Sequence, residues 1–399
     1  MNTFHERMVE MDRTDELGSF REQFVFAEPA TTYLDGNSLG RLPARVPQLV
    51  QRVVTEEWGR ELIGSWNDHW LPMVERIRGK LAQLLGVESS EILLGDSTSI
   101  QLFKLASAIG RHFAGSKVIT DRYNFPSDLY VLEQCARNVG RALILAEDVS
   151  PEDDFSDVAY LSLSHVRFAS GFRFDLPAFH GKAPMIWDLS HSVGVVPVSL
   201  RDATAAVGCT YKYLNGGPGA PAFMYLAAEL VEALENPVPG WFGHAAPFGF
   251  TPEYVPSPGI ERFQISTPPV LSVAAMEPGL DLVLEAGIAR IWEKACLLTQ
   301  AFIAATQELT PELRCVTPLS PESRGAHVSL AHPEAWRICQ SLIQHHRVIP
   351  DFRAPDLVRF GFSPLTTRFI DVYEAVFRLR EVLDRESFRQ IPQQRPRIT

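Results

Sequence analysis

One lysine, Lys212, stands where chemistry with an aldehyde cofactor could take place. It lies between two tyrosines, and the glycine-rich turn 215–219 (NGGPG) follows it. Upstream, the apolar stretch 183–187 leads into Asp188, which a hydroxyl and an imidazole follow closely. Pyridoxal phosphate chemistry needs an amine that binds the aldehyde as a Schiff base, a carboxylate that keeps the pyridine nitrogen protonated, and donors for the phosphate. A lone lysine is usually a surface residue, but these neighbours together favour a cofactor site.

A second set of polar residues, 95–99 (GDSTS), follows a predicted strand at 91–94 and precedes a predicted helix from about 100 to 112. Free N–H groups and the helix dipole make such a helix start attractive to phosphate. Plain N-capping by a serine or threonine is the alternative. The position of this loop ahead of Asp188 and Lys212 favours the phosphate site.

The stretch 33–43 (YLDGNSLGRLP) is typical of a short strand that enters a turn rich in glycine and asparagine. It could be a connecting turn. It could also be a substrate loop in which Asn37 and Ser38 present polar groups from a constrained backbone. The residues alone leave both interpretations open.

Strands and helices alternate through the first two thirds of the chain. This alternation predicts an α/β fold, with a mostly parallel sheet covered by helices on both faces. Ligands bind such sheets at the carboxyl ends of the strands, and Ser99, Asp128, Asp188 and Lys212 stand at or just after predicted strand ends or at the start of the element that follows. Strands are expected at 91–94, 117–120, 142–145, 158–163, 184–187 and 220–227, and helices at 45–64, 72–86, 100–112 and from 124 to about 139.

A smaller α+β unit is expected near the C-terminus, after a loop-rich segment at 233–268. Long loops inside compact domains are usually functional. We therefore predict an N-terminal arm and substrate loop at 1–45 that packs with the small domain, a large cofactor-binding domain at 46–270, and the small domain at 271–399. In the C-terminal part, helix is expected from about 270 to 307, at 334–346 and at 369–386, with strands at 326–330 and 357–360.

Composition narrows the class of protein. The 399 residues carry a formal net charge of −11, which argues against a nucleic-acid partner and gives no attraction to anionic lipid. No apolar stretch is long enough to span a bilayer, and the N-terminus lacks an apolar signal core. The five cysteines are widely spaced and odd in number, so neither zinc nor a disulfide framework is expected. A cytoplasmic protein without a metal is the prediction.

Taken together, seven stretches resemble kynureninase of the bacterial type, a pyridoxal phosphate enzyme family with the aspartate-aminotransferase fold (fold type I). The pieces WDLSHS and YKYLN alone would indicate only the wider class V aminotransferase group. The resemblance implies hydrolysis of L-kynurenine to anthranilate and L-alanine in tryptophan catabolism, by a homodimer with shared active sites. The matching stretches are 33–43, 96–99, 125–128, 187–192, 211–215, 240–244 and 359–362, in family order.

The resemblance also implies roles for single residues. Lys212 should carry the cofactor, Asp188 should pair with the pyridinium nitrogen, and Tyr211 is a candidate proton donor to the β-carbon. Tyr211 could instead only pack, Phe125 could be a core residue, and Trp241 could be a dimer contact. The other expected cofactor ligands are Phe125 over the ring, Asp128 on its oxygen side, Thr98, Ser99, Tyr211 and His191 around the phosphate, and Trp241 and Thr267 from the partner subunit.

For the substrate, the resemblance implies that Arg359 holds the α-carboxylate, because its planar fork matches a planar anion. Asn37 and Ser38 should lie near that carboxylate. The alternative is a surface ion pair of Arg359 with Asp351 or Asp356.

At the aniline end, Trp66 and Thr267 stand where family members that prefer the 3-hydroxylated substrate have His and Asn. Ser266 stands where the kynurenine-preferring pattern has glycine. Rival functions are a related enzyme acting on 3-hydroxykynurenine or a modified kynurenine, a class V aminotransferase or desulfurase, and a binding module without catalysis.

Overall fold

The computed structural model describes residues 2–394, and its large domain is built on one mixed sheet. The strands of the described chain follow the order β2-β8-β7-β6-β5-β3-β4. The neighbours from β7 through β6, β5 and β3 to β4 are parallel, and β8 is antiparallel to both β7 and β2. The mostly parallel sheet is thus confirmed. Its strands are β2 (Ile92–Leu94), β3 (Lys117–Asp121), β4 (Ala142–Ala146), β5 (Val158–Ser164), β6 (Met185–Asp188), β7 (Ala205–Gly208) and β8 (Phe223–Leu226).

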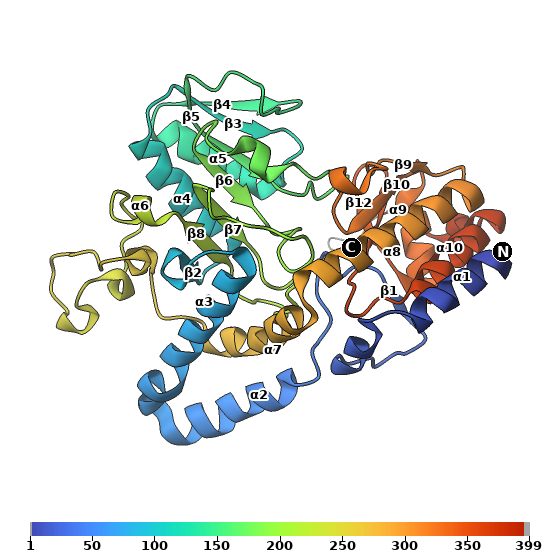
Figure 1. Ribbon diagram of the computed structural model, residues 1–399, viewed down its shortest axis with the longest axis horizontal. Coiled ribbons are helices and arrows are strands. Elements are labelled where there is room, and N and C mark those ends of the chain that lie inside the picture. Colours follow the sequence, from blue (N-terminus) through green and yellow to red (C-terminus); the bar gives the residue numbers. More distant parts are fainter. Residues whose placement is uncertain (1, 395–399) are drawn as a thin grey trace.

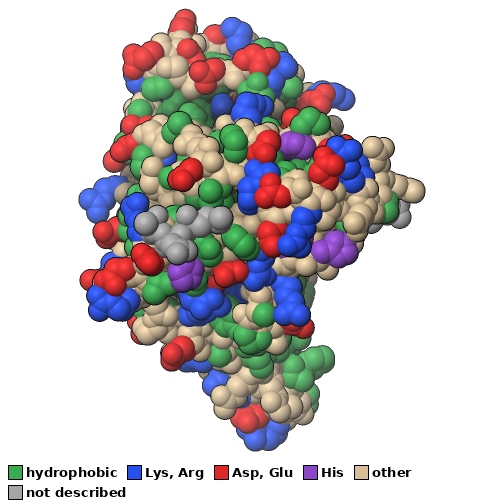
Figure 2. All heavy atoms as spheres, turned by 90° about the vertical axis from the view of Figure 1, so that its right-hand side faces the viewer, with side chains coloured by type: hydrophobic (Ala, Val, Ile, Leu, Met, Phe, Trp, Pro, Cys, Tyr) green, Lys and Arg blue, Asp and Glu red, His purple; other side chains and the backbone are tan. Residues whose placement is uncertain are grey.

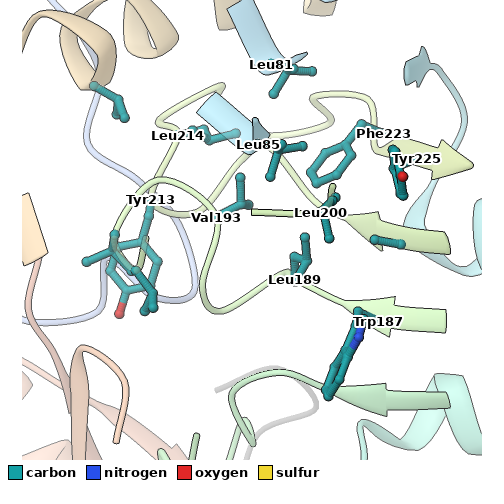
Figure 3. Close-up of a cluster of buried hydrophobic side chains, with 14 of the residues drawn as sticks. Leu81, Leu85, Trp187, Leu189, Val193, Leu200, Tyr213, Leu214, Phe223 and Tyr225 are labelled. Carbon is teal, nitrogen blue, oxygen red and sulfur yellow. The ribbon is translucent and has the colours of Figure 1, made fainter. Parts of the chain in front are cut away.

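Helices cover both faces of this sheet, and its central strands are therefore buried throughout (Figure 1). Neighbouring residues of β6 point to opposite faces: Ile186 packs with α4 and α5, while Trp187 packs with the cluster that includes α3 and α7. Figure 3 shows the second cluster, where Leu81 and Leu85 approach Phe223. The helices are α3 (Leu71–Leu85), α4 (Thr98–His112), α5 (Pro126–Asn138), the short α6 (Ala228–Val231) and α7 (Val270–Ala286).

Three expectations about these elements need correction. The predicted helix at 45–64 is α2 (Val46–Arg52) followed by a π-helical stretch, Val53–Glu61. The single helix expected from about 270 to 307 is two helices, because Gly287 breaks it with φ +81°. Strand β7 was not predicted, since its four residues are too few and too small to show a strand pattern.

The small domain holds a four-stranded antiparallel sheet within the described residues, in the order β12-β13-β10-β9. Helix α1 (Asn2–Arg13) lies along α10, and Asp12 accepts hydrogen bonds from the first two N–H groups of that helix, at 2.7 and 2.9 Å. The elements are β9 (Arg314–Cys315), β10 (His327–Ala331), β12 (Asp351–Arg353), β13 (Leu357–Gly361), α8 (Ile288–Leu309), α9 (Ala335–His346) and α10 (Phe369–Asp384), with β1 (Thr32–Tyr33) pairing with β11 (Val348–Ile349) beside them.

The surface differs between the two domains. Figure 2 shows the small-domain face, where Lys and Arg side chains lie next to Asp and Glu. Large exposed aromatic side chains lie instead at Trp241, Phe248 and Phe250, in a loop that projects from the large domain (Figure 1). Among residues 2–394, none of the helices combines the length and apolar character needed to cross a membrane.

Candidate active site

A cavity of about 370 Å³ lies at the carboxyl ends of β6 and β7, between α4, α5 and the loop after β7. Parallel strands end together at this edge, so the side chains that follow them converge. The cavity brings together eight of the residues singled out in the sequence: Thr98, Ser99, Phe125, Asp128, Asp188, His191, Tyr211 and Lys212.

Lys212 follows β7 and meets the imidazole that follows β6. The distance from Lys212 Nζ to His191 Nε2 is 2.9 Å. His191 is buried, and this burial, with the positive charge of Lys212, lowers the pKa of its imidazole well below the ordinary value. The ring is therefore neutral and can accept a hydrogen bond from the amine.

Asp188 is the last residue of β6 and is held rigidly. One carboxylate oxygen accepts hydrogen bonds from the Ser190 N–H at 2.9 Å and from the Ser190 hydroxyl at 2.6 Å. The other accepts a weaker bond from the Ser164 hydroxyl at 3.4 Å. A buried carboxylate oriented in this way is suited to face a protonated ring nitrogen.

The start of α4 supplies the donors for a phosphate. Thr98 and Ser99 are its first residues, and both line the cavity with their N–H groups in the first turn. Ser97 caps the helix at 3.4 Å. Helix capping by a hydroxyl, which the sequence offered as the alternative to a phosphate site, is therefore present. Ser97 provides this cap, so Thr98 and Ser99 stay available to a ligand. Beneath the loop, the buried Lys104 pairs with Asp96 at 2.9 Å, which anchors the turn.

Asp128, near the start of α5, is 2% exposed, and its Oδ2 atom has no hydrogen-bond partner among residues 2–394. Burial, followed by the nearby Asp188 carboxylate, raises the pKa of Asp128 well above the ordinary range. A lone buried acceptor at the wall of a cavity indicates a place for a donor from a ligand.

Replacing Asp128 with asparagine is expected to stabilise the cofactor-free protein above neutral pH. An acid whose pKa is raised on folding contributes stability below its unfolded pKa of about 4, and that contribution is lost as the pH rises. The variant should thus match the parent near pH 4 and exceed it at pH 8 by roughly 1–3 kcal/mol. Urea unfolding at both pH values measures this difference. The exposed Asp68→Asn is the control, and equal effects of the two variants at pH 8 would contradict the prediction.

Two aromatic residues of the site can be placed. Phe125 is 41% exposed and meets the Phe168 ring edge-on, with centroids 5.2 Å apart, so it is not a core residue. Tyr211 lines the cavity beside Lys212, and burial raises the pKa of its phenol above the ordinary value. The phenol is therefore protonated at neutral pH and can donate.

Arg359 is not among the residues that line the cavity, but it adjoins it through Phe168, whose carbonyl accepts its Nη1–H at 2.6 Å. It is 1% exposed, and its Nη2 group donates to Ser38 Oγ at 2.9 Å and pairs with Asp351. The Asn37 amide oxygen accepts from Arg359 Nε at 2.9 Å in the orientation that satisfies both groups. The pairing with Asp351 thus exists, but it is buried rather than on the surface.

The remaining predicted residues lie outside the cavity. Trp66 packs edge-on against Trp70 at 5.0 Å and near Phe242 at 6.5 Å. Trp241 is 42% exposed next to Phe242, Ser266 is exposed, and Thr267 is half-buried. Within one protomer these residues do not reach Lys212.

The residues that line the cavity fit pyridoxal phosphate. An amine, a rigid carboxylate, a helix N-terminus with two hydroxyls and a half-exposed aromatic ring face the same space. Two buried polar atoms have no hydrogen-bond partner among the described residues, Oδ2 of Asp128 and Nδ1 of His191. A ligand group or a water molecule could pair with each of them.

Four of the cavity residues that received no individual role from the sequence also shape the site. Asp96 and Ser164 follow or end strands, so the strand-end rule could have found them. Ser190 stands inside WDLSHS and holds Asp188. Phe168 carries no sequence signal, because only the fold brings it opposite Phe125.

Comparison with known proteins agrees with this site. Residues 291–379 match the family model described as the kynureninase C-terminal domain. The kynureninase of Burkholderia mallei (strain SAVP1) is 41% identical to this chain, over 96% of both. The kynureninase of Pseudomonas fluorescens is also 41% identical, over 95% of both.

Solved structures share the fold at low identity. A cysteine desulfurase from Thermococcus onnurineus superposes with a TM-score of 0.77 at 18% identity, covering 94% of this chain and 98% of its own. A C-DES mutant with glycine covalently linked to its pyridoxal phosphate gives 0.77 at 17% identity, covering 90% and 99%. The α/β architecture with a smaller C-terminal domain is therefore that of fold type I.

Proposed function

Because the chain belongs to the kynureninase family, we propose that it hydrolyses L-kynurenine to anthranilate and L-alanine, with pyridoxal phosphate as cofactor. The observation that carries this proposal is the 41% identity over 96% of both chains. Lys212 and Asp188, which the chemistry needs, line one cavity. Water adds to the γ-carbonyl, the bond from this carbon to the β-carbon breaks, and the β-carbon takes up a proton.

When bound, pyridoxal phosphate supplies an electron sink for charge released on the substrate. Lys212 would hold its aldehyde carbon, Asp188 its ring nitrogen, and Thr98 and Ser99 its phosphate. The amine of Lys212, once free, can move the α-proton of the substrate. The Tyr211 phenol, protonated because burial raises its pKa, can donate to the β-carbon.

Arg359 is the candidate ligand for the substrate carboxylate. Its donors already contact Asn37, Ser38, Phe168 and Asp351, so substrate must share or displace one of these partners. Among residues 2–394, Nη1 has the Phe168 carbonyl as its acceptor, and it can offer its second hydrogen to the substrate. The cluster holds the guanidinium in one orientation before substrate arrives, which lowers the entropy lost on binding.

The desulfurase alternative is not favoured by the cysteines. Such an enzyme needs a reactive thiolate on an accessible loop, but Cys209, the cysteine that lines the cavity, is 2% exposed. Burial raises the pKa of this thiol and of the other four. All five cysteines are free thiols, which supports our further proposal of a cytoplasmic location.

The direct test is to mix the purified protein with L-kynurenine and follow the fluorescence of anthranilate, with L-alanine measured in parallel. Equal amounts of the two products support hydrolysis. Transfer of the amino group without anthranilate, or release of sulfide from cysteine, would favour a related fold type I enzyme instead.

We expect the protein to prefer L-kynurenine over its 3-hydroxy analogue by roughly ten- to hundredfold in kcat/KM. An indole at the aniline end, from Trp66, offers apolar surface and one N–H donor but no acceptor for a phenol proton. Burying that hydroxyl unpaired costs about 1–3 kcal/mol. The measurement is the pair of kcat/KM values on the two substrates.

Ser266 is the residue that could reverse this preference, because its exposed hydroxyl could pair with the added phenol. If the Ser266 hydroxyl pairs with the added phenol, Ser266→Gly should lower kcat/KM for 3-hydroxykynurenine and thus increase the preference for L-kynurenine. Equal kcat/KM values for the two substrates in the parent protein would show that Ser266 outweighs Trp66.

We propose a homodimer with shared active sites. Trp241 and Thr267 do not reach Lys212 within one protomer, and the loop that carries Trp241 projects from the large domain with exposed Phe248 and Phe250 (Figure 1). Large aromatic side chains on a projecting segment are typical of an interface. A second copy would cover them and bring Thr267 to the neighbouring cavity.

Mixed dimers provide the test of this sharing. In a dimer of Lys212→Ala with Thr267→Ala, one site receives both mutations and the other receives neither. Random exchange should restore about one quarter of the wild-type sites, above the sum of the separate variants. Activity that equals this sum, or sedimentation of an active monomer, would contradict the shared site.

A further inference from the structure

His191 is held in one tautomer by its contact with Lys212. The Lys212 amine lies 2.9 Å from Nε2 of His191, and with this amine as the donor, Nε2 is the acceptor and carries no proton. Because the buried ring is neutral, its proton lies on Nδ1. That N–H group needs an acceptor, and it has none among residues 2–394.

His327 stands beside this unpaired donor. Its ring centroid is 5.4 Å from that of His191, and the planes meet at 57°. His327 is 0% exposed, and the backbone carbonyl of Arg167 lies near one of its ring nitrogens, where it raises the pKa of the ring and leaves the other nitrogen as the acceptor. Two ring nitrogens, one from each histidine, thus remain without a partner among the described residues in one buried place, although buried polar atoms are rarely left unpaired.

The fold holds His327 at this position. It is the first residue of β10 and pairs with Gly361 of β13, so it belongs to the small domain, whereas His191 follows β6 of the large domain. Gly171 packs so tightly that a Cβ there would lie 3.4 Å from the His327 ring and 2.8 Å from its carbonyl oxygen. The close approach of Gly171 to the His327 carbonyl fixes the backbone of His327 against the 171 turn.

The charges that face the pair are all positive. Burial comes first, and Arg359, Lys212 and Arg353 then lower the pKa of both histidines well below the ordinary value. His327 is consequently neutral and keeps one ring nitrogen free as an acceptor. The two rings make no direct hydrogen bond, since their centroids lie 5.4 Å apart with the planes at 57°, and one water molecule between the two nitrogens would pair both of them.

We propose that His327 is a positioning residue that accepts the Nδ1 proton of His191 through one water molecule, and so keeps His191 Nε2 as the acceptor that orients Lys212. The contact joins the two domains at the reactive amine. The catalytic consequence rests on the proposed function, whereas the tautomer is a property of the chain alone. Cofactor-free protein can therefore test it, whatever the substrate.

The first measurement is the nitrogen NMR spectrum of histidine-labelled, cofactor-free protein. The expected spectrum has His191 protonated on Nδ1 and unprotonated on Nε2. In His327→Leu this tautomer should give way to a mixture, and pyridoxal phosphate should bind about tenfold more weakly, which is the loss expected for one buried hydrogen bond. His327→Gln, whose amide oxygen restores an acceptor, should recover both properties.

His165→Gln is the matched control, since His165 is also buried, at 2% exposure, but its ring packs against Trp187 rather than against His191. It should leave the His191 tautomer unchanged. Protonated Nε2 in the parent protein overturns the proposal, and so does an unchanged tautomer in folded His327→Leu. If that variant does not fold, the parent spectrum and His327→Gln decide. A confirmed tautomer without binding of pyridoxal phosphate would refute the proposed function and leave this inference standing.

Discussion

Replacing Lys212 with alanine is expected to lower the turnover of L-kynurenine by about 10⁴-fold or more. Among the described residues that line the cavity, Lys212 is the one lysine, so no second amine can take its place. Its Nζ atom also has one fixed neighbour, His191 at 2.9 Å, which orients it. The rate of anthranilate formation measures the loss.

Attachment of the cofactor to Lys212 can also be measured without any turnover of substrate. The parent protein should be yellow, lose its visible band on borohydride reduction and then carry the cofactor on the peptide that contains Lys212. Lys212→Arg keeps the charge but should remain inactive, while the exposed Lys182→Ala should behave as the parent. A colourless parent protein that binds no added pyridoxal phosphate would contradict the cofactor assignment.

Replacing Asp188 with asparagine should reduce kcat by roughly 10²–10³-fold, because it removes a preorganised negative charge without changing the shape of the side chain. The amide oxygen can still accept from the Ser190 N–H, now at 2.9 Å. The variant therefore tests charge rather than position. Steady-state kinetics, together with the pH dependence of the visible band of the loaded protein, measure the effect.

Ser190→Ala is the matched control for Asp188. It removes the hydroxyl that donates to the carboxylate at 2.6 Å but keeps the charge, and it should cost only about tenfold. If Asp188→Asn were no worse than Ser190→Ala, the charge of Asp188 would not be needed, and its assignment to the ring nitrogen would be wrong.

Local sequence determined the elements of the large domain and most of the cavity. Helix α3 was predictable because apolar residues recur at helical spacing and Gly86, with φ +71°, ends it. Asp188 was predictable as a site residue because it ends an apolar strand at the ligand-binding edge of the sheet, and Lys212 was predictable from its own neighbours, two tyrosines and a glycine-rich turn. Both signals depend on residues close together in the chain.

Tertiary structure decided which distant groups meet. The two- and three-residue strands β9, β11 and β12 exist only through pairing with remote partners, and so they leave no periodic signal. Pairing in the small domain brings Asp351 opposite Arg359, so that what could have been a surface ion pair is a buried one.

For the site, the sequence by itself determined which residue types stand at the strand ends, and therefore the class of chemistry. It could not determine that His191 faces Lys212 through Nε2, or that His327 from the other domain lies behind it. Those facts depend on side-chain rotamers and on the docking of two domains. Their free energies come from packing and desolvation, and in the case of His191 and His327 from segments more than 100 residues apart, which local spacing does not encode.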